Sequence, residues 1–401
     1  MGAPTVSTVR VLHTADWHVG KSLKGLSRLD EQEQVLREIV RITREQEVDA
    51  VLVAGDLYDS AAPSAAAQRL VVRTLMALAR TEAQVIVIAG NHDHAATLDA
   101  YRPFAGAAGV TLVGSVRTAE TGGVVEFTSR GGERGTVAVL PFLSQRYAVR
   151  AAELVAQSPA ENTSTYDQHV RSLVRALTAG FRTDAVNLVM AHLTVLGGTF
   201  GGGERAAQSI FEYSVPAAVF PPDAHYVALG HLHRRQALAA PVPVHYSGAP
   251  LAVDFGEQDN TSVVLLVEAT PTTPARVTDI PITAGRRLRT VHGTVAELAG
   301  MGGALGDDLL RVVVRERARA GLREEVTELL PNALEVRIDP EFAALVTGSR
   351  PSTGGADRSP GELFGEYLGT RAVDDRRVEE LFARLHDRVT DVSRGRAGEG
   401  L

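Results

Sequence analysis

The stretch that most constrains this chain is Val85–His94, where a run of apolar residues ends at Gly90 and polar side chains follow at once. A continuous run of β-branched residues is typical of a buried parallel strand, and open α/β sheets place their chemistry at the carboxyl ends of such strands. Glycine allows the tight turn. Asn91 then offers an amide oxygen, and His92 offers an imidazole that can bind a metal ion or move a proton. A polar turn at a strand end explains this stretch equally well when it is taken alone.

Four other apolar runs end in residues of the same kind, which favours a shared site. The runs and the residues that follow them are Val9–Leu12 with Asp16 and His18, Val48–Ala54 with Asp56, Val186–Ala191 with His192, and His225–Leu229 with His231 and His233. In an extended segment Asp16 and His18 point to the same side, because they are two residues apart. We therefore predict one polar cluster at one edge of one sheet, which Val244–Tyr246 and Val263–Val267 complete.

The predicted cluster contains two carboxylates and five imidazoles, which are costly to remove from water without a partner. Two divalent cations about 3.5–4 Å apart would satisfy them. The mixture of imidazole, carboxylate and amide ligands suits Mn²⁺ or Fe²⁺ better than Mg²⁺, and it leaves zinc open. The alternative is a hydrogen-bonded polar edge without metal.

Length and composition indicate the organisation of the chain. Its 401 residues predict two or three domains, and its 44% of apolar residues allows a real core. There are no cysteines, which excludes disulfides and thiolate zinc sites and is compatible with the cytoplasm. We expect no signal peptide and no membrane span. The net charge of -7 argues against a protein that coats nucleic acid, but not against a nuclease whose acidic site binds metal ions.

The pattern of apolar residues changes along the chain. Helical spacing appears over Leu29–Glu47, from Pro63 to Arg80, and over Ala151–Phe181. Beyond residue 284, strands over 288–293, 309–314 and 334–338 and a helix over 321–330 predict a small α+β unit. We place the boundaries at 1–283 for the first domain, 284–348 for the small unit, 349–360 for a linker and 361–401 for a helical segment.

Three further segments suggest contacts with other molecules. The small unit carries arginines that are able to contact phosphates, although solvated surface charge explains at least half of them equally well; they are Arg286, Arg287, Arg289, Arg311, Arg315, Arg317, Arg319 and Arg323. The amphipathic helix pair predicted over 361–390 follows a linker, so we expect it to bind a partner rather than its own body. The glycine-rich loop Leu196–Arg205 is expected to be a flexible, exposed lip that contacts substrate.

The order of the motifs resembles the calcineurin-like metallophosphoesterases. These motifs are Asp16-x-His18, Gly55-Asp56, Gly90-Asn-His-Asp93, His192 and Gly230-His-Leu-His233. Further stretches are similar to the SbcD-type nuclease subunits of that superfamily, over roughly residues 8–270. They are His13-Thr-Ala-Asp-Trp-His18, Ala54-Gly-Asp-Leu-Tyr-Asp59, Tyr246-Ser-Gly-Ala-Pro250 and Phe255-Gly-Glu257.

The resemblance implies a fold and a set of roles. The fold would be a metallophosphoesterase-type β-sandwich flanked by helices, with a small α+β capping domain and a C-terminal helix pair. One metal ion would be held by Asp16, His18 and His233, and a second by Asn91, His192 and His231, with Asp56 bridging both. His92 would face the scissile phosphate and help protonate the leaving oxygen. Mn²⁺ is the expected metal.

The resemblance also implies a nuclease that cuts double-stranded DNA from its ends and single-stranded DNA internally. It would act as a homodimer with an SbcC-type ATPase, whose coiled coil would receive the 361–390 helices. The alternative is a metallophosphoesterase for a small phosphodiester or a phosphoprotein. A DNA-end-binding scaffold without catalysis is disfavoured, because a scaffold has no reason to keep His92.

Other polar residues near these motifs are expected to be supporting. His13 is interpreted as structural, and His225 and His245 as buried structural residues in strands. Asp59 is interpreted as a helix cap or a support for the site, with a role as a metal ligand as the alternative. Asp93 is expected to orient His92 or to cap the next helix. His94 is not expected to belong to the site.

Overall fold

The computed structural model describes residues 7–144, 166–204 and 214–342, together with five residues between 364 and 382. The chain divides into two compact units, Met1–Ala343 and Ala344–Leu401. The predicted boundaries at 283/284 and 348/349 fall inside these units and stay predictions.

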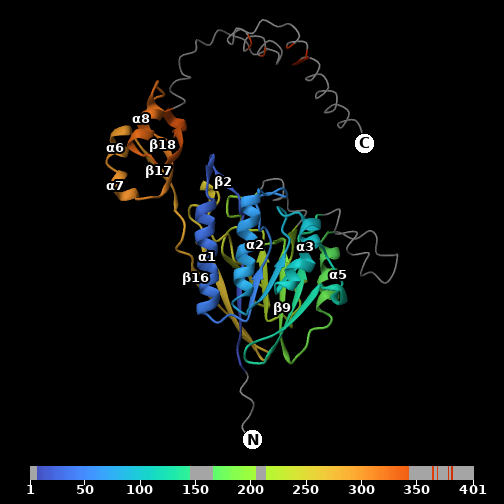
Figure 1. The fold of residues 1–401 in the computed structure, drawn as a ribbon. Helices are drawn as coiled ribbons and strands as arrows, with labels where there is room; N and C mark the ends of the chain where they lie inside the picture. Colours follow the sequence, from blue (N-terminus) through green and yellow to red (C-terminus); the bar gives the residue numbers. More distant parts are fainter. Residues whose placement is uncertain are drawn as a thin grey trace. The chain divides into compact units, whose positions relative to one another are not determined.

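The larger unit contains two six-stranded mixed sheets packed face to face (Figure 1). In order, the first sheet is β16 (Thr273–Pro281), β15 (Val263–Thr270), β1 (Val9–Thr14), β4 (Ala50–Val53), β5 (Gln84–Ile88) and β6 (Val110–Val113). The second is β13 (Gln236–Leu238), β14 (Val244–Tyr246), β12 (Tyr226–Gly230), β9 (Ala185–His192), β8 (Arg134–Leu140) and β7 (Val124–Thr128). Alternate residues of both sheets, such as Ile86 and Leu188, form the core between them. This is the expected sandwich.

The expectation of a single sheet was wrong. Tyr226–Gly230 and Val244–Tyr246 pair in parallel in the second sheet, whereas Val263–Thr270 pairs antiparallel with β1 in the first. An apolar run shows only that a strand is buried on both faces, and strands of either sheet meet that condition because helices cover the outer faces.

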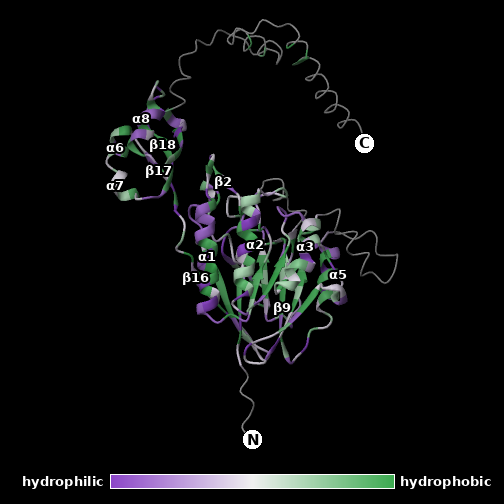
Figure 2. Cartoon of the chain, viewed as in Figure 1, coloured by the Kyte–Doolittle hydropathy of each residue, from purple (hydrophilic) through white to green (hydrophobic). Residues whose placement is uncertain are grey.

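Among the described residues, three helices cover the outer face of the first sheet and one covers that of the second. The three are α1 (Leu29–Glu45), α2 (Ala65–Ala79) and α3 (Ala95–Ala107), and the fourth is α5 (Tyr166–Thr178). In Figure 2 the strands are largely hydrophobic, whereas α1 shows much hydrophilic surface. The sequence patterns did not indicate α3, which contains Pro103 and buries Leu98. The N-terminal part of the helix expected over 151–181 lies outside the described residues.

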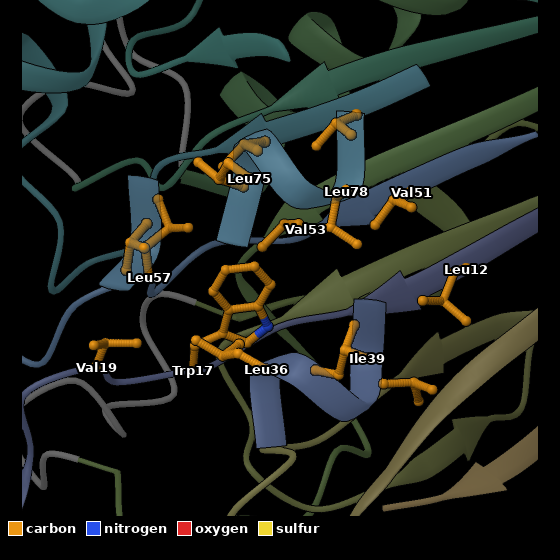
Figure 3. Packing of buried hydrophobic residues seen from close by; sticks show 14 of the residues in the cluster. Leu12, Trp17, Val19, Leu36, Ile39, Val51, Val53, Leu57, Leu75 and Leu78 are labelled. Atoms are coloured by element: carbon orange, nitrogen blue, oxygen red, sulfur yellow. The ribbon is translucent and has the colours of Figure 1, made fainter. Parts of the chain in front are cut away.

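The core under α1 and α2 includes the side chain of Trp17, which follows β1. Figure 3 shows the indole among Leu36 of α1, Val53 of β4 and Leu57. The ring is 3% exposed, and its Nε1 donates to Thr14 Oγ1 at 3.0 Å. Trp17 therefore anchors the segment that carries Asp16 and His18.

Shorter elements connect these layers. They are the paired strands β2 (Ser22–Leu23) and β3 (Leu26–Ser27), the paired strands β10 (Thr194–Val195) and β11 (Ser214–Val215), and the 3₁₀ turns η1 (Ala119–Thr121), η5 (Ala217–Val219) and η6 (Phe255–Glu257).

Residues 288–338 form a three-stranded parallel sheet with its own core. Its elements are β17 (Leu288–Gly293), α6 (Val295–Ala299), α7 (Gly302–Leu305), β18 (Leu309–Val314), α8 (Leu322–Leu329) and β19 (Ala333–Ile338). The three strands and α8 match the prediction, and α6 and α7 are additional. Five of the eight arginines form ion pairs with acidic residues, so much of this charge is balanced within the chain.

The predicted linker 349–360 and most of the predicted helix pair lie outside the described residues. Within that stretch the structure describes Phe364, Leu368, Val378, Leu381 and Phe382, all helical. The rings of Phe364 and Phe382 stack with centroids 4.1 Å apart. Among the described residues, no helix is long and apolar enough to span a membrane.

Candidate metal centre

The structure brings all eight predicted site residues together, where the carboxyl ends of strands from both sheets meet. Asp16 and His18 follow β1, Asp56 follows β4, and Asn91 and His92 follow β5. The second sheet supplies His192 at the end of β9 and His231 and His233 after β12. The predicted residues therefore lie together where two sheets meet, in place of one, and their roles stay predictions.

Two groups of buried side chains in this cluster offer atoms close enough to hold a metal ion. Asp16, His18 and His233 have ligand atoms within 4.8 Å of one another, and so do Asp16, Asp56 and His192. His18 Nε2 and His233 Nε2 are 3.0 Å apart. Such convergence of lone pairs is what a cation requires.

The Asn91 amide oxygen lies between two imidazoles of the second sheet. Its Oδ1 is 2.9 Å from His192 Nε2 and 2.7 Å from His231 Nδ1. These three groups, which come from three strand ends, form a second set of nitrogen and oxygen donors beside the first.

The two oxygens of the Asp56 carboxylate have different neighbours. Oδ1 accepts a hydrogen bond from the His92 backbone N–H at 2.8 Å. Oδ2 lies 3.7 Å from His18 Nε2 and 3.5 Å from His192 Nε2. Asp56 Oδ2 is therefore the atom shared by both donor sets, and Oδ1 fixes the loop that carries His92.

The backbone at Asp16 and His18 is not extended, contrary to the argument from spacing. Their φ angles are 55° and 44°, in the left-handed region that side chains other than glycine seldom adopt. The buried Trp17 between them and the bond from the His231 N–H to Asp16 Oδ1, at 3.0 Å, hold this conformation. Backbone strain of this kind is common at functional sites, where the surrounding structure fixes it.

Two glycines allow the loops to approach one another closely. A Cβ at Gly55, which has a φ of 95°, would lie 2.2 Å from His192 Nδ1. A Cβ at Gly90 would lie 2.1 Å from Asp56 Oδ1. Both positions therefore exclude every other residue type, and this explains the glycine in each motif.

Two carboxylates that the sequence analysis did not assign hold the loop of His233. Glu257 is 1% exposed, accepts a short hydrogen bond from His233 Nδ1, and accepts one from the Val253 N–H at 2.6 Å. Glu204 accepts a hydrogen bond from the His233 N–H at 2.9 Å. A carboxylate on the far nitrogen of a histidine is the usual support for a metal ligand.

The glycine-rich loop is described as far as Glu204, and it is only partly the exposed lip that we expected. Leu196 is 49% exposed. The Glu204 carboxylate, however, accepts from the N–H groups of Gly201 and Gly202 at 2.6 and 2.7 Å. These bonds and the Glu204–His233 contact hold the end of the loop against the cluster.

The Asp93 carboxylate links two of the strand-end loops. It accepts hydrogen bonds from the N–H groups of Gly90, Leu57 and Tyr58 at 2.9, 3.2 and 3.1 Å. The alternative that Asp93 caps the next helix was wrong, because the helix cap of α3 is His94, whose side chain accepts from the Thr97 N–H. That Asp93 orients His92 stays a prediction. The two loops joined by Asp93 are those of Asp56 and Asn91.

The loop that follows β4 holds the ring of His92. Its Nδ1 donates to the Asp59 carbonyl oxygen at 2.7 Å, and its ring meets that of His18 edge-on, with centroids 4.6 Å apart. Asp59 supports the site through its carbonyl oxygen, and its Oδ1 also lies 4.0 Å from His18 Nδ1. His92 also belongs, with His18 and Asp59, to a third group of potential ligands.

The remaining histidines near the motifs have structural partners. His13 Nδ1 lies 2.9 Å from the Tyr226 hydroxyl in the core between the sheets. His225 Nδ1 accepts from the Asn187 N–H at 3.0 Å. His245 is half-buried, with its ring 5.5 Å from that of Tyr226.

The electrostatics of the cluster indicate a place for positive charge. Burial raises the pKa of Asp16 to about 7 and lowers that of His231 to about 3. Burial opposes protonation of His192 and His233, yet Asp56 and Glu257 respectively raise the pKa of each to about 9. The buried carboxylates thus favour positive charge beside them. Divalent cations provide this charge and use the lone pairs of the cluster, so the donor set fits them.

Comparison with known proteins supports this assignment. The model of the calcineurin-like phosphoesterase family matches residues 9–235. The chain is 38% identical over 284 residues to the SbcD subunit of nuclease SbcCD from Bacillus subtilis, which covers 70% of this chain and 71% of the relative.

Two other relatives carry the same name. The SbcD subunit of Rhodobacter capsulatus is 37% identical, in a match that covers 62% of this chain and 64% of the relative. The SbcD subunit of Escherichia coli is 30% identical, in a match that covers 65% of this chain and 64% of the relative. The chain thus spans slightly less than two thirds of these two relatives.

The family enzymes use two divalent metal ions, and the clusters described above are the candidate residues for them. The chain belongs to the calcineurin-like phosphoesterase family and, within it, to the SbcD-type nuclease subunits.

Proposed function

We propose that this chain is the nuclease subunit of an SbcCD-type complex and that it hydrolyses DNA phosphodiester bonds with two metal ions. The observation that carries the proposal is the position of Asp56 Oδ2 between His18 and His192, with donor sets on both sides. The relatives that share the motifs are named as nuclease subunits.

In this proposal Asp16, His18 and His233 would hold one ion, Asn91, His192 and His231 would hold the other, and Asp56 would contribute to both sites. The hydrogen-bonded Asn91 contacts and the close His18–His233 pair support this division. When bound, two divalent ions neutralise the charge of the phosphate and activate the attacking water. Mn²⁺ is the metal that we propose, because the donors mix imidazole with oxygen.

His92 then acts on the substrate. The bond from Nδ1 to the Asp59 carbonyl oxygen orients the ring and keeps a proton on Nδ1. We infer that Nε2 contacts the scissile phosphate and gives its proton to the leaving oxygen. An imidazole is suited to this role because it is able to transfer protons near neutral pH. The Asp56 contact to the His92 backbone couples this residue to the donor sets.

The small unit over 284–348 is proposed to cap the site and to contact DNA. It packs on the turn that contains Glu257, because Phe255 clusters with Leu288 and Leu309. The Arg311 guanidinium lies 4.7 Å from the centroid of the Phe255 ring. A movement of this unit would therefore reach the loop that holds His233.

Partners are inferred from the relatives and from exposed surface. We propose that residues 361–401 bind an SbcC-type ATPase and that the complex acts on DNA in the cytoplasm. Homodimer formation is supported by apolar side chains on the adjacent helices α2 and α3 (Figure 1), where Met76, Tyr101 and Phe104 are 43%, 49% and 79% exposed. Exposed apolar groups of this kind mark contact surfaces.

The test is an assay of the purified chain with Mn²⁺ on end-labelled DNA, beside a chromogenic phosphodiester. We expect both substrates to be cleaved and the chelated enzyme to cleave neither. Hydrolysis of the small ester without any cleavage of double- or single-stranded DNA would contradict the nuclease proposal and favour a small-substrate phosphodiesterase.

A further inference from the structure

A cavity of about 560 Å³ adjoins the candidate metal centre on the side of β5, β6 and β8. The Asn91 side chain belongs to both, because its Oδ1 contacts His192 and His231 while the residue also lines the cavity. A group joined to a phosphate at the metal centre would therefore enter this cavity directly. The volume lies within the range of about 300–1,000 Å³ that is typical of small-molecule sites.

The chemistry of the walls favours a flat, uncharged group. Phe142, Leu143, Val116 and Ala95 provide apolar surface, and Ser115 adds a hydroxyl. Among the lining residues in the described ranges there is no lysine or arginine, so the walls lack the charged donors that hold a phosphate.

The helix end at the cavity does not change this conclusion. The N-terminus of α3 opens toward the cavity through Ala95 and Ala96. A helix N-terminus attracts anions, but here the His94 imidazole already accepts from the Thr97 N–H at 3.2 Å. The helix end is thus capped from within the chain.

Phe142 is fixed between the cavity and the cluster. Its backbone N–H donates to the Ala89 carbonyl oxygen at 2.9 Å, which joins the end of β8 to the end of β5. Its ring lies 6.1 Å from the ring of His192 and 6.1 Å from that of His231, with a tilt of 31° to the latter. An aromatic face held next to a phosphate site is the usual platform for a nucleobase.

We propose that this cavity binds one nucleobase of the DNA strand that is being cut, next to the scissile phosphate, with Phe142 as the stacking surface. The inference rests on the proposed nuclease function and extends it to a substrate subsite. Because stacking accepts every base, the site would position the strand without selecting a sequence.

The experiment measures what a base adds to binding. Deoxyadenosine monophosphate and deoxyribose phosphate, which lacks the base, are compared as inhibitors of chromogenic phosphodiester hydrolysis with Mn²⁺. We expect the nucleotide to inhibit about 10- to 100-fold more strongly, the range expected from the stacking of one base. Phe142→Ala and Ala96→Trp, which remove the platform and fill the cavity, should reduce this ratio to near one.

Ala66→Trp is the matched control. Ala66 is the second residue of α2, as Ala96 is of α3; both are exposed, and Ala66 does not line the cavity. The control should keep the ratio of the unchanged chain. Equal inhibition by the two compounds in the unchanged chain, or a ratio that survives in both cavity variants, would overturn the proposal.

The result separates this inference from the proposed function. A ratio of one in a chain that cleaves DNA refutes the base site alone. A high ratio that the cavity variants abolish, in a chain that cleaves no DNA, supports the base site and refutes the nuclease function.

Discussion

Replacing Glu257 by glutamine tests whether the candidate metal centre depends on the carboxylate behind His233. Glu257 is almost fully buried and accepts hydrogen bonds from the ring of His233 and from the Val253 N–H. Glutamine has nearly the same shape, but it has only one accepting oxygen, so its NH₂ group must face one of these two donors. The ring of His233 would lose its negative partner, and either this ring or the Val253 N–H would also lose its acceptor.

The expected loss is confined to one of the two ions. Removal of a carboxylate behind a metal-bound histidine weakens binding about 10- to 100-fold, or about 1.4–2.8 kcal/mol. Titration of the purified chain with Mn²⁺ in a calorimeter should therefore show one site weakened by this factor and the other, which uses Asn91, His192 and His231, little changed. Circular dichroism checks that the variant is folded.

Glu204→Gln is the control for this prediction, because Glu204 meets His233 only at the backbone N–H. We expect it to change metal affinity less than Glu257→Gln does. Unchanged affinity in Glu257→Gln, an equal loss at both sites, or the same loss in the control would refute the reasoning that the ring contact of Glu257 supports the metal ligand.

Four other perturbations test separate parts of the proposal. His92→Ala should retain two metal ions by elemental analysis and lose nuclease activity, whereas loss of an ion would make His92 a ligand. Asp56→Ala should empty at least one site, and full occupancy would contradict the shared position of its Oδ2. A chain without 361–401 should still cleave single-stranded DNA with Mn²⁺ but should not co-purify with the ATPase, and retained binding would refute the role of the tail. Burial opposes ionisation of Glu31, but Arg28 and Arg286 lower its pKa from 4.5 to about 2. Its ion pairs should therefore stabilise the fold above pH 4.5 by about 2 kcal/mol after solvent screening, and the difference between unchanged chain and Glu31→Gln in urea unfolding should vanish as the pH falls toward 2.

The positions of the site residues were predictable because strands and their ends leave a strong local signal. The apolar run before Asn91 and the run before His192 each indicate a buried strand, and parallel strands present their carboxyl ends at one edge. The partition of the strands between two sheets was not predictable, because the pairing of β12 with β9 rather than with β1 depends on contacts between distant segments. The sandwich was predicted from the resemblance to a family, and the local sequence pattern did not predict it.

The contacts of the supporting carboxylates could not be predicted, for a different reason. Glu257 lies 24 residues from the histidine that it contacts, and no periodicity relates the two. Asp93 is within a motif, yet its partners include the N–H groups of Leu57 and Tyr58 on another loop. A sequence shows which groups are able to accept hydrogen bonds, but the fold decides which backbone donors they meet.

These carboxylates also explain how the donor atoms are kept in position by the protein itself. Asp16 binds the His231 N–H, Asp56 binds the His92 N–H, and Asp93 joins the loops after β4 and β5. The bonds of Asp16 to His231, of Asp56 to His92 and of Asp93 to Leu57 each join one strand-end loop to another, so the loops hold one another in place. A site fixed in this way pays little reorganisation free energy when its cations and substrate bind, which is the condition for strong electrostatic catalysis. The left-handed backbone at Asp16 and His18 is consistent with this view, because strained residues persist only where their neighbours hold them.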